Sequence, residues 1–265
     1  MNLNIDGRIA LISGASGGLG LASAKCLAEE GVRLFLTDMN EEALRAAVDE
    51  LHESVVGFYK ADLTDESDIN TLADKVKAVG GADILVHLAG ITGAKGDPLT
   101  MKDEDWMECW NINFMSAVRV CRAIVPGMVE KGWGRVVLTV SENAVQPYPD
   151  EAVYNASKAA LLSYTKALSL PYGPKGVLVN AVMPAFIESP MTDGMMEKLS
   201  EELGVSQEEA VEHFLEKERP YLTLKRRGRA DEVAAAVALL CSDRTTFTNG
   251  SAWRVDGGAV AAINT

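Results

Sequence analysis

Short β-rich runs alternate with helical patterns along the whole chain of 265 residues, and this alternation constrains the fold more than any other feature. Parallel strands need long crossover connections, which are usually helices, and the helices then cover both faces of the sheet. Because such crossovers are right-handed, the sheet is doubly wound. The sequence therefore predicts a doubly wound α/β (Rossmann) sheet with six main helices and seven parallel strands, at residues 8–13, 32–37, 55–59, 83–87, 135–140, 176–180 and 252–255.

No change in composition and no linker rich in Pro, Gly or Ser divides the chain, so we expect a single domain over residues 1–265. The regular alternation of strands and helices is interrupted between Pro184 and Arg229, where the connection is far longer than the usual ~2–6 residues. Two helices are expected there, at 195–203 and from the capping box that Ser206 begins. Ligands bind at this edge of such sheets, so residues 188–227 are predicted to form a substrate lid. The alternative is an excursion that packs on the core or on a partner subunit.

Composition makes several functions improbable. The chain has 25 Lys and Arg against 38 Asp and Glu, a net charge of -13, which repels phosphate backbones and anionic bilayers. We therefore expect no binding to nucleic acid or membranes. The N-terminus lacks the pattern of a secretion signal, and no uninterrupted apolar run reaches the ~18 residues of a membrane span. The 4 scattered cysteines and 3 histidines have neither disulfide-frame nor metal-ligand spacing, so we expect no metal and a cytoplasmic location.

A glycine-rich turn, residues 13–20 (SGASGGLG), directly follows the first predicted strand and begins a helix. Glycines let the backbone approach a pyrophosphate, and the helix N-terminus offers free N–H groups and partial positive charge. A tight strand-to-helix connection is the alternative interpretation. The strand and helix context favours a dinucleotide site formed by Gly14, Ser16, Gly18, Leu19 and Gly20.

Asp38 stands just after the second predicted strand. A carboxylate there can accept hydrogen bonds from the adenosine ribose and repels a 2′-phosphate, so it favours NAD over NADP. The alternative is an ordinary aspartate at a helix start, since Asn40 is a candidate N-cap.

Tyr154 and Lys158 are four residues apart on a predicted helix, so the phenol and the ammonium share one face. A tyrosine ionises near pKa ~10, and a fixed cation lowers that pKa, which makes the pair a candidate acid/base. Taken alone, such a pair is more often an exposed helix face. Lys158 by itself in a wet site cannot lower the pKa by two to three units, so we expect a positively charged cofactor ring to contribute as well.

Together and in this order, these features resemble the short-chain dehydrogenase/reductase family over essentially the whole chain. The resemblance implies that Tyr154 is the general acid/base, that Ser141 hydrogen-bonds the substrate oxygen, and that Lys158 lowers the pKa of Tyr154 and holds the nicotinamide ribose. It further implies that Asn113 supports Lys158 through a water. Further cofactor contacts are implied at Asp62 and Leu63 (adenine), at Ala89 and Gly90, and at Pro184, Ile187 and Ser189 (nicotinamide end).

The chain departs from the family pattern at three places. Ser13 replaces a threonine, His87-Leu88 stands where the family shows Asn-Asn, and Ala185 replaces a glycine. None of these changes removes a catalytic group. For His87 a hydrogen-bonded structural role is favoured over proton transfer.

Three functions remain open. The first is an NAD(H)-dependent oxidoreductase that acts on a secondary alcohol or ketone of medium size, such as a cyclic alcohol or a diol. The second is NADP(H)-dependent reduction of 3-oxoacyl thioesters on an acyl carrier protein, against which Asp38 and the acidic charge argue. The third is a non-catalytic dinucleotide-binding protein. By analogy with the family, we expect a homotetramer formed through the helices at 106–129 and 153–170, and a pocket lined by the lid, residues 91–95, Glu142, Asn143, Val145, Gln146 and Tyr148.

Overall fold

The computed structural model describes residues 2–263 and contains one seven-stranded sheet. All six strand pairs are parallel, in the order β3-β2-β1-β4-β5-β6-β7. The order reverses between β1 and β4, which is where such sheets open a ligand crevice. The predicted fold class is therefore confirmed. The strands are β1 (Ile9–Ser13), β2 (Arg33–Asp38), β3 (Val55–Lys60), β4 (Ile84–His87), β5 (Gly134–Thr139), β6 (Val177–Pro184) and β7 (Ala252–Val255).

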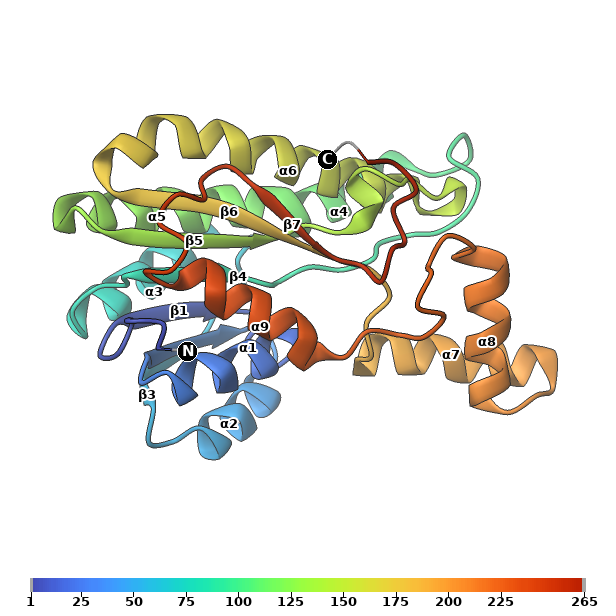
Figure 1. The fold of residues 1–265 in the computed structure, drawn as a ribbon, viewed down its shortest axis with the longest axis horizontal. Helices are drawn as coiled ribbons and strands as arrows, with labels where there is room; N and C mark the ends of the chain where they lie inside the picture. Colours follow the sequence, from blue (N-terminus) through green and yellow to red (C-terminus); the bar gives the residue numbers. More distant parts are fainter. Residues whose placement is uncertain (1, 264–265) are drawn as a thin grey trace.

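Helices cover both faces of this sheet (Figure 1). One apolar core forms against α1, α2 and α9, with Leu27, Leu44 and Val237 fully buried in it. A second core forms on the opposite face against α3, α5 and α6, and it includes Leu72 and Leu161. The helices of these layers are α1 (Gly18–Glu29), α2 (Glu41–Glu50), α3 (Glu66–Ala78), α4 (Asp103–Trp110), α5 (Ser116–Lys131), α6 (Ala152–Tyr172) and α9 (Ala230–Cys241).

Strands β2 and β6 end later in the chain than the sequence predicts. Strand β2 runs through Asp38, so this residue is the last of the strand rather than the first after it. Strand β6 continues to Pro184 because its second half, Ala181–Pro184, pairs with β7, while β5 pairs with Val177–Val182 on the other side. Both extensions lie at the carboxyl edge of the sheet, where the candidate site residues gather.

A single π-helical turn, Asn111–Met115, joins α4 to α5. Among the described residues, the combined helix Asp103–Lys131 is the one stretch long and apolar enough to cross a membrane, with a mean hydropathy of 1.3 over an 18-residue window. Buried core helices can have the same length and hydropathy, so these two properties are weak evidence for a membrane span. Val120, Ile124 and Met128 of this helix are buried in the core that lies against α3, α5 and α6.

The long connection after β6 contains a pair of helices, α7 (Pro190–Leu203) and α8 (Gln207–Glu218), which project from the body of the molecule (Figure 1). Helix α7 begins earlier than predicted because Ser189 caps it in a capping box with Thr192. Helix α8 begins at the predicted capping box of Ser206 and Glu209. The pair has a small core of its own, in which the rings of Phe186 and Phe214 lie 4.7 Å apart.

Candidate active site

The glycine-rich turn connects β1 to α1 at the point where the strand order reverses. Gly14 has φ +67, and a Cβ there would lie 2.8 Å from the backbone nitrogen of Ala89, so only glycine lets the two chains approach this closely. Helix α1 has Gly17 as its N-cap and no side-chain cap, which leaves its first N–H groups available to a ligand. A Cβ at Gly18 would lie 3.3 Å from the Cβ of Ser189, so the start of α7 borders the same turn. This cradle of glycines and backbone donors fits a pyrophosphate.

Asp38 connects the glycine turn to the start of α2. Its Oδ2 accepts a hydrogen bond from the backbone N–H of Ser16 (3.1 Å) and its Oδ1 accepts one from Asn40 (3.1 Å). Asn40 in turn caps α2 by accepting from the N–H of Ala43. The two interpretations of Asp38 are therefore compatible, since one carboxylate organises the helix start and borders the candidate dinucleotide cradle.

The residues expected at the adenine and nicotinamide ends follow β3 and β6. The Asp62 carboxylate accepts hydrogen bonds from the Thr64 hydroxyl (2.7 Å) and N–H (2.8 Å), and these bonds lower the pKa of Asp62. The neighbouring Leu63 is buried. After β6, the carbonyl of Ile187 accepts from the Thr192 hydroxyl (2.7 Å), which ties this segment to the first turn of α7.

Tyr154 and Lys158 lie together near the start of α6, with the Lys158 Nζ 5.6 Å from the centre of the tyrosine ring. Lys158 is buried and donates a hydrogen bond to the carbonyl of Thr139 (2.8 Å) at the end of β5. Burial lowers the pKa of Lys158 to about 8. Burial and the charge of Glu142 raise the pKa of Tyr154, while a hydrogen bond with Ser141 opposes that rise. The expected lowering of the tyrosine pKa by Lys158 is thus absent from the protein alone, because desolvation of the phenol dominates.

Asn113 lies in the π-helical turn and fixes the segment after β4. Its Oδ1 accepts from the N–H of Ile91 (2.8 Å), and its Nδ2 donates to the Ile91 carbonyl (2.8 Å) and to the Ser157 hydroxyl (3.0 Å). A Cβ at Gly90 would lie 3.1 Å from Asn113 Oδ1 and 3.5 Å from Lys158 Nζ. The structure therefore brings Asn113 and Lys158 together across Gly90, the residue at which the chain was expected to pass close to a cofactor.

Ser141 is buried and follows β5, and its hydroxyl contacts the carboxyl group of Glu142. The Oγ lies 2.8 Å from Glu142 Oε2 and 3.1 Å from Asn143 Oδ1. Glu142 also faces Arg219 at the end of α8, with 3.8 Å between Arg219 Nε and Glu142 Oε1. The sequence marked Glu142 only as a pocket residue and gave no signal for Arg219, because residues 77 positions apart meet only through the fold.

His87 occupies a fully enclosed position at the end of β4. Its Nδ1 lies 2.8 Å from the hydroxyl of Ser13 and its Nε2 lies 3.2 Å from that of Ser116, so it joins β1, β4 and α5. Burial, with a contribution from the charge of Lys158, lowers the pKa of His87 to about 3. The imidazole is neutral at physiological pH, which agrees with the structural role expected from the sequence. Among residues 2–263, no group of three or more His, Cys, Asp or Glu side chains is placed to hold a metal ion.

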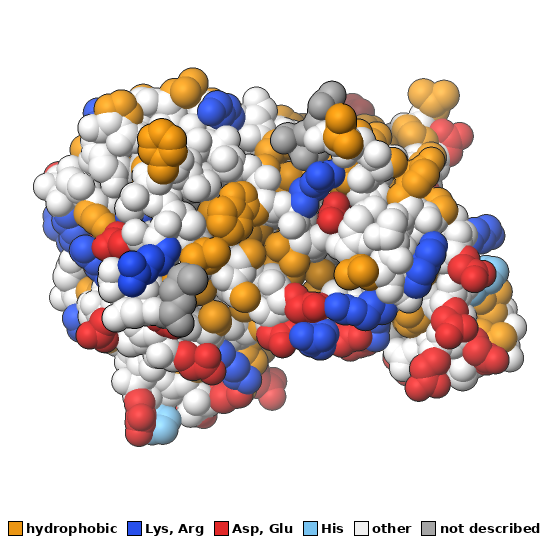
Figure 2. Space-filling view, in the orientation of Figure 1, with side chains coloured by type: hydrophobic (Ala, Val, Ile, Leu, Met, Phe, Trp, Pro, Cys, Tyr) orange, Lys and Arg blue, Asp and Glu red, His pale blue; other side chains and the backbone are white. Residues whose placement is uncertain are grey.

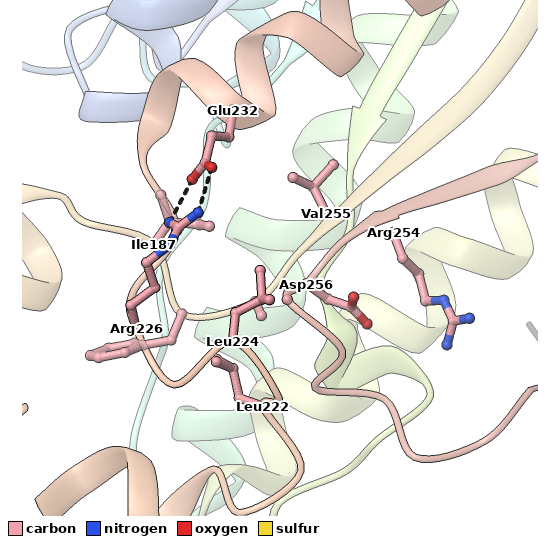
Figure 3. A pocket seen from close by; sticks show the side chains of 12 residues that line it. Ile187, Leu222, Leu224, Arg226, Glu232, Arg254, Val255 and Asp256 are labelled. Carbon is pink, nitrogen blue, oxygen red and sulfur yellow. Dashed lines mark hydrogen bonds and ion pairs between the residues drawn. The ribbon is translucent and has the colours of Figure 1, made fainter. Parts of the chain in front are cut away.

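A cavity of about 220 Å³ lies between the end of the helical insert and the end of β7 (Figure 3), and its lining includes Ile187 but none of Asn113, Ser141, Tyr154 and Lys158. Leu222, Leu224 and Ile187 form its apolar walls. At one side, Arg226 makes a two-point ion pair with Glu232 of α9 (2.7 and 2.9 Å). This pair fastens the end of the insert to the body of the molecule.

Comparison with known proteins agrees with this geometry. Residues 14–260 match the family model described as enoyl-(acyl carrier protein) reductase. The 3-oxoacyl-(acyl-carrier-protein) reductase FabG of Thermotoga maritima is 32% identical over 263 residues, covering 97% of this chain and 100% of that protein. The crystal structure of L-sorbose reductase from Gluconobacter frateurii, complexed with NADPH and L-sorbose, has a TM-score of 0.93 at 32% identity and covers 99% of this chain and 100% of that chain. The structure of NAD⁺-bound xylitol dehydrogenase has a TM-score of 0.87 at 28% identity, with 96% and 100% covered.

The chain belongs to the short-chain dehydrogenase/reductase family. It is an NAD(P)-dependent oxidoreductase of that family, and a nicotinamide dinucleotide is its cofactor class. The resemblance drawn from the sequence is confirmed, and the alternative of a non-catalytic binding protein is set aside.

Proposed function

We propose that this protein is an NAD(H)-dependent oxidoreductase that interconverts a secondary alcohol and a ketone, with Tyr154 as the general acid/base. The observation that carries the proposal is the meeting of three side chains at the carboxyl edge of the sheet. Ser141 interacts with the phenol of Tyr154 and opposes the rise in its pKa, and the ammonium of Lys158 lies 5.6 Å from the centre of the tyrosine ring. Lys158 Nζ would lie 3.5 Å from a Cβ at Gly90, the residue at which the chain was expected to pass close to a cofactor, and this supports a cofactor bound alongside these side chains.

Each side chain has a distinct role in this proposal. A bound nicotinamide supplies or accepts the hydride. Tyr154 takes the proton of the alcohol during oxidation and returns one to the oxygen during reduction. Ser141 donates a hydrogen bond to the substrate oxygen while negative charge develops on it. Lys158 stabilises the phenolate, and Asn113 holds the backbone of Ile91 so that the crevice keeps its shape.

Asp38 supports NAD rather than NADP. Its carboxylate ends β2 beside Ser16, and neither residues 13–20 nor the following Met39 and Asn40 provide a Lys or Arg for a 2′-phosphate. The two structural neighbours were bound to different dinucleotides, NADPH in one and NAD⁺ in the other, so the preference for NAD is inferred from this chain's own residues.

Asp38→Asn keeps an oxygen that can accept from Ser16 but removes the charge. We expect the ratio of kcat/KM for NAD to that for NADP to fall about 10- to 100-fold, equivalent to ~1.4–2.8 kcal/mol. Steady-state kinetics with both cofactors measures the ratio, and Asp49→Asn, on the exposed face of α2, is the matched control. A wild-type enzyme that already prefers NADP would show that our interpretation of Asp38 is wrong.

Reduction of 3-oxoacyl thioesters is the second candidate, because FabG is a full-length relative at 32% identity. The helical insert argues against an acidic carrier protein as the substrate carrier. Acidic side chains gather on the outer end of the insert (Figure 2), and they include the exposed Glu201, Glu202, Glu208, Glu209 and Glu212. Comparing turnover of an acetoacetyl thioester with that of simple ketones separates the two candidates.

We also propose that α7 and α8 form a lid over the substrate and that the protein works in the cytoplasm. The contact of Ser189 with the glycine turn supports the lid, since α7 begins at the crevice. The four cysteines are free, and three of them are buried, which suits a reducing compartment.

A homotetramer built through α4, α5 and α6 is the proposed assembly. Met107 and Trp110 are 63% and 38% exposed, and aromatic rings continue from Trp110 through Phe114 to Tyr164 on α6. A second copy of the same face would cover this strip. We expect sedimentation to give about four times the 28.4 kDa chain mass, and Trp110→Glu to lower it while Leu99→Glu, on an exposed loop, does not. A monomeric wild-type protein would contradict the proposal.

A further inference from the structure

Glu142 is a buried carboxyl group placed directly against the candidate catalytic serine. It begins a short 3₁₀ turn, Glu142–Ala144, and is only 2% exposed. Its Oε2 lies 2.8 Å from Ser141 Oγ. A carboxyl group enclosed in this way interacts with protein neighbours instead of water, so its charge state acts directly on them.

The cation closest to Glu142 comes from the helical insert. Arg219 follows α8, is 6% exposed, and uses Nη2 to donate to both oxygens of Glu151 (3.1 and 3.2 Å). Its guanidinium stacks 3.5 Å from the ring centre of Tyr148. Its Nε has no hydrogen-bond partner and lies 3.8 Å from Glu142 Oε1. Arg219 is thus fixed by Glu151 and leaves Glu142 close to a cation but without a direct hydrogen bond to it.

Ser141 has one hydrogen, and two side-chain oxygens compete for it. Asn143 presents its Oδ1 to Ser141 because its Nδ2 already donates to Glu151 (2.6 Å) and Asn155 (2.9 Å). An ionised Glu142 can only accept, and a charged acceptor is the stronger competitor. A protonated Glu142 can instead donate to Ser141 Oγ, which removes the charged competitor and lets the serine hydrogen turn from the neutral acceptors Asn143 Oδ1 and the Pro184 carbonyl to a substrate oxygen.

We propose that Glu142, with its charge tuned by Arg219 of the insert, is a positioning residue that decides whether Ser141 directs its hydrogen to the substrate oxygen. The inference rests on the proposed function, in which Ser141 stabilises negative charge developing on that oxygen. Glu142 exchanges its proton with solvent and forms no bond to the substrate. Because oxidation and reduction pass through the same transition state, the protonated form of Glu142 is the active one in both directions.

Burial, opposed by the charge of Arg219, places the titration of Glu142 in the neutral range. Burial raises the pKa of Glu142 to about 7, the charge of Arg219 and the Ser141 hydrogen bond oppose that rise, and the charge of Glu151 adds to it. Lys95 pairs with Glu151 (2.7 Å) at the edge of the cluster. The titratable and charged side chains that face this group from all sides are Arg219, Glu151, Tyr148, Tyr154 and, beyond Glu151, Lys95.

The test is the pH dependence of kcat/KM in both directions, with the alcohol and ketone pair that the wild type turns over best. In the wild type we expect kcat/KM for reduction to fall about tenfold per pH unit above a break near pH 7. In Glu142→Gln, which cannot ionise, the value should change by no more than about twofold between pH 6 and pH 8. For oxidation, the wild type should show a break near the same pH, and Glu142→Gln should lack it.

Two further variants test whether the charge near Glu142 sets the pH of the break. Glu151→Gln removes a negative charge near Glu142, so the break should move to lower pH, whereas Asp150→Asn, exposed in the same 3₁₀ turn, should leave it in place. Thermal unfolding checks that each variant is folded. A break that persists in Glu142→Gln, or an equal loss of activity at every pH, contradicts this inference while leaving the proposed function intact. Full turnover by Tyr154→Phe would overturn the proposed function itself.

Discussion

Tyr154→Phe is expected to abolish nearly all turnover while the protein still folds and binds NAD(H). The substitution removes one oxygen, and with it the group that exchanges a proton with the substrate, a contribution of about 10²–10⁴-fold in rate. The phenyl ring keeps its packing on α6 and its place beside Lys158. Steady-state kinetics measures the loss, and fluorescence titration with NADH checks that the cofactor still binds.

Tyr164→Phe is the matched control, because Tyr164 lies on the same helix and contacts Phe114 instead of the candidate site. It should retain wild-type turnover to within about twofold, as expected for a change away from the site. If Tyr154→Phe kept a tenth or more of the wild-type kcat, Tyr154 would not be the acid/base and the assignment of the site would be wrong.

Lys158→Met is expected to lower kcat by about 10²-fold, because the phenolate of Tyr154 loses its nearest cation. Lys166→Met, an exposed position on the same helix, should leave kcat unchanged. The loss should not come from unfolding, since methionine fills a similar volume without a charge.

The difference in stability between Lys158→Met and the wild type should become smaller as the pH rises above 8. The pKa of Lys158 falls from its ordinary value to about 8 in the folded protein. Below pH 8 both the folded and unfolded states carry the charge, so the wild type bears the full cost of burying it. Between pH 8 and about 10.4 the folded state has lost the proton first, and the wild type gains stability. The advantage of Lys158→Met in thermal unfolding without added cofactor should therefore be largest below pH 8 and shrink above it. A difference that does not depend on pH would contradict the lowering of the Lys158 pKa by burial.

The fold was predictable because it follows from local patterns. Buried apolar runs of strand length, such as residues 8–13, alternate with helical periodicity, and this alternation allows few arrangements other than a doubly wound sheet. Capping residues fixed some boundaries as well, since α8 begins where Ser206 and Glu209 predicted it. The start of α7 was predicted too late, because the capping partner of Ser189 is Thr192, which is not a typical capping-box acid.

The candidate site was predictable as a set of residues but not as an electrostatic environment. Tyr154 and Lys158 are one helical turn apart, so their proximity follows from spacing alone. The raised pKa of Tyr154 does not, because it depends on how deeply the phenol is buried and on the charge of Glu142. Arg219 was missed for the same reason. Its place beside Glu142 depends on the packing of the insert, which no local pattern encodes.

Transfer of deuterium from the substrate carbon to the nicotinamide tests the central claim most directly. Secondary alcohols and diols deuterated at the carbinol carbon, xylitol included, would be incubated with NAD and the wild-type enzyme, and the reduced cofactor examined by proton NMR. We expect at least one alcohol to place deuterium at C4 of the nicotinamide, and the same alcohol to give none with Tyr154→Phe. Product formation without label in the cofactor, or undiminished labelling by Tyr154→Phe, would contradict the account.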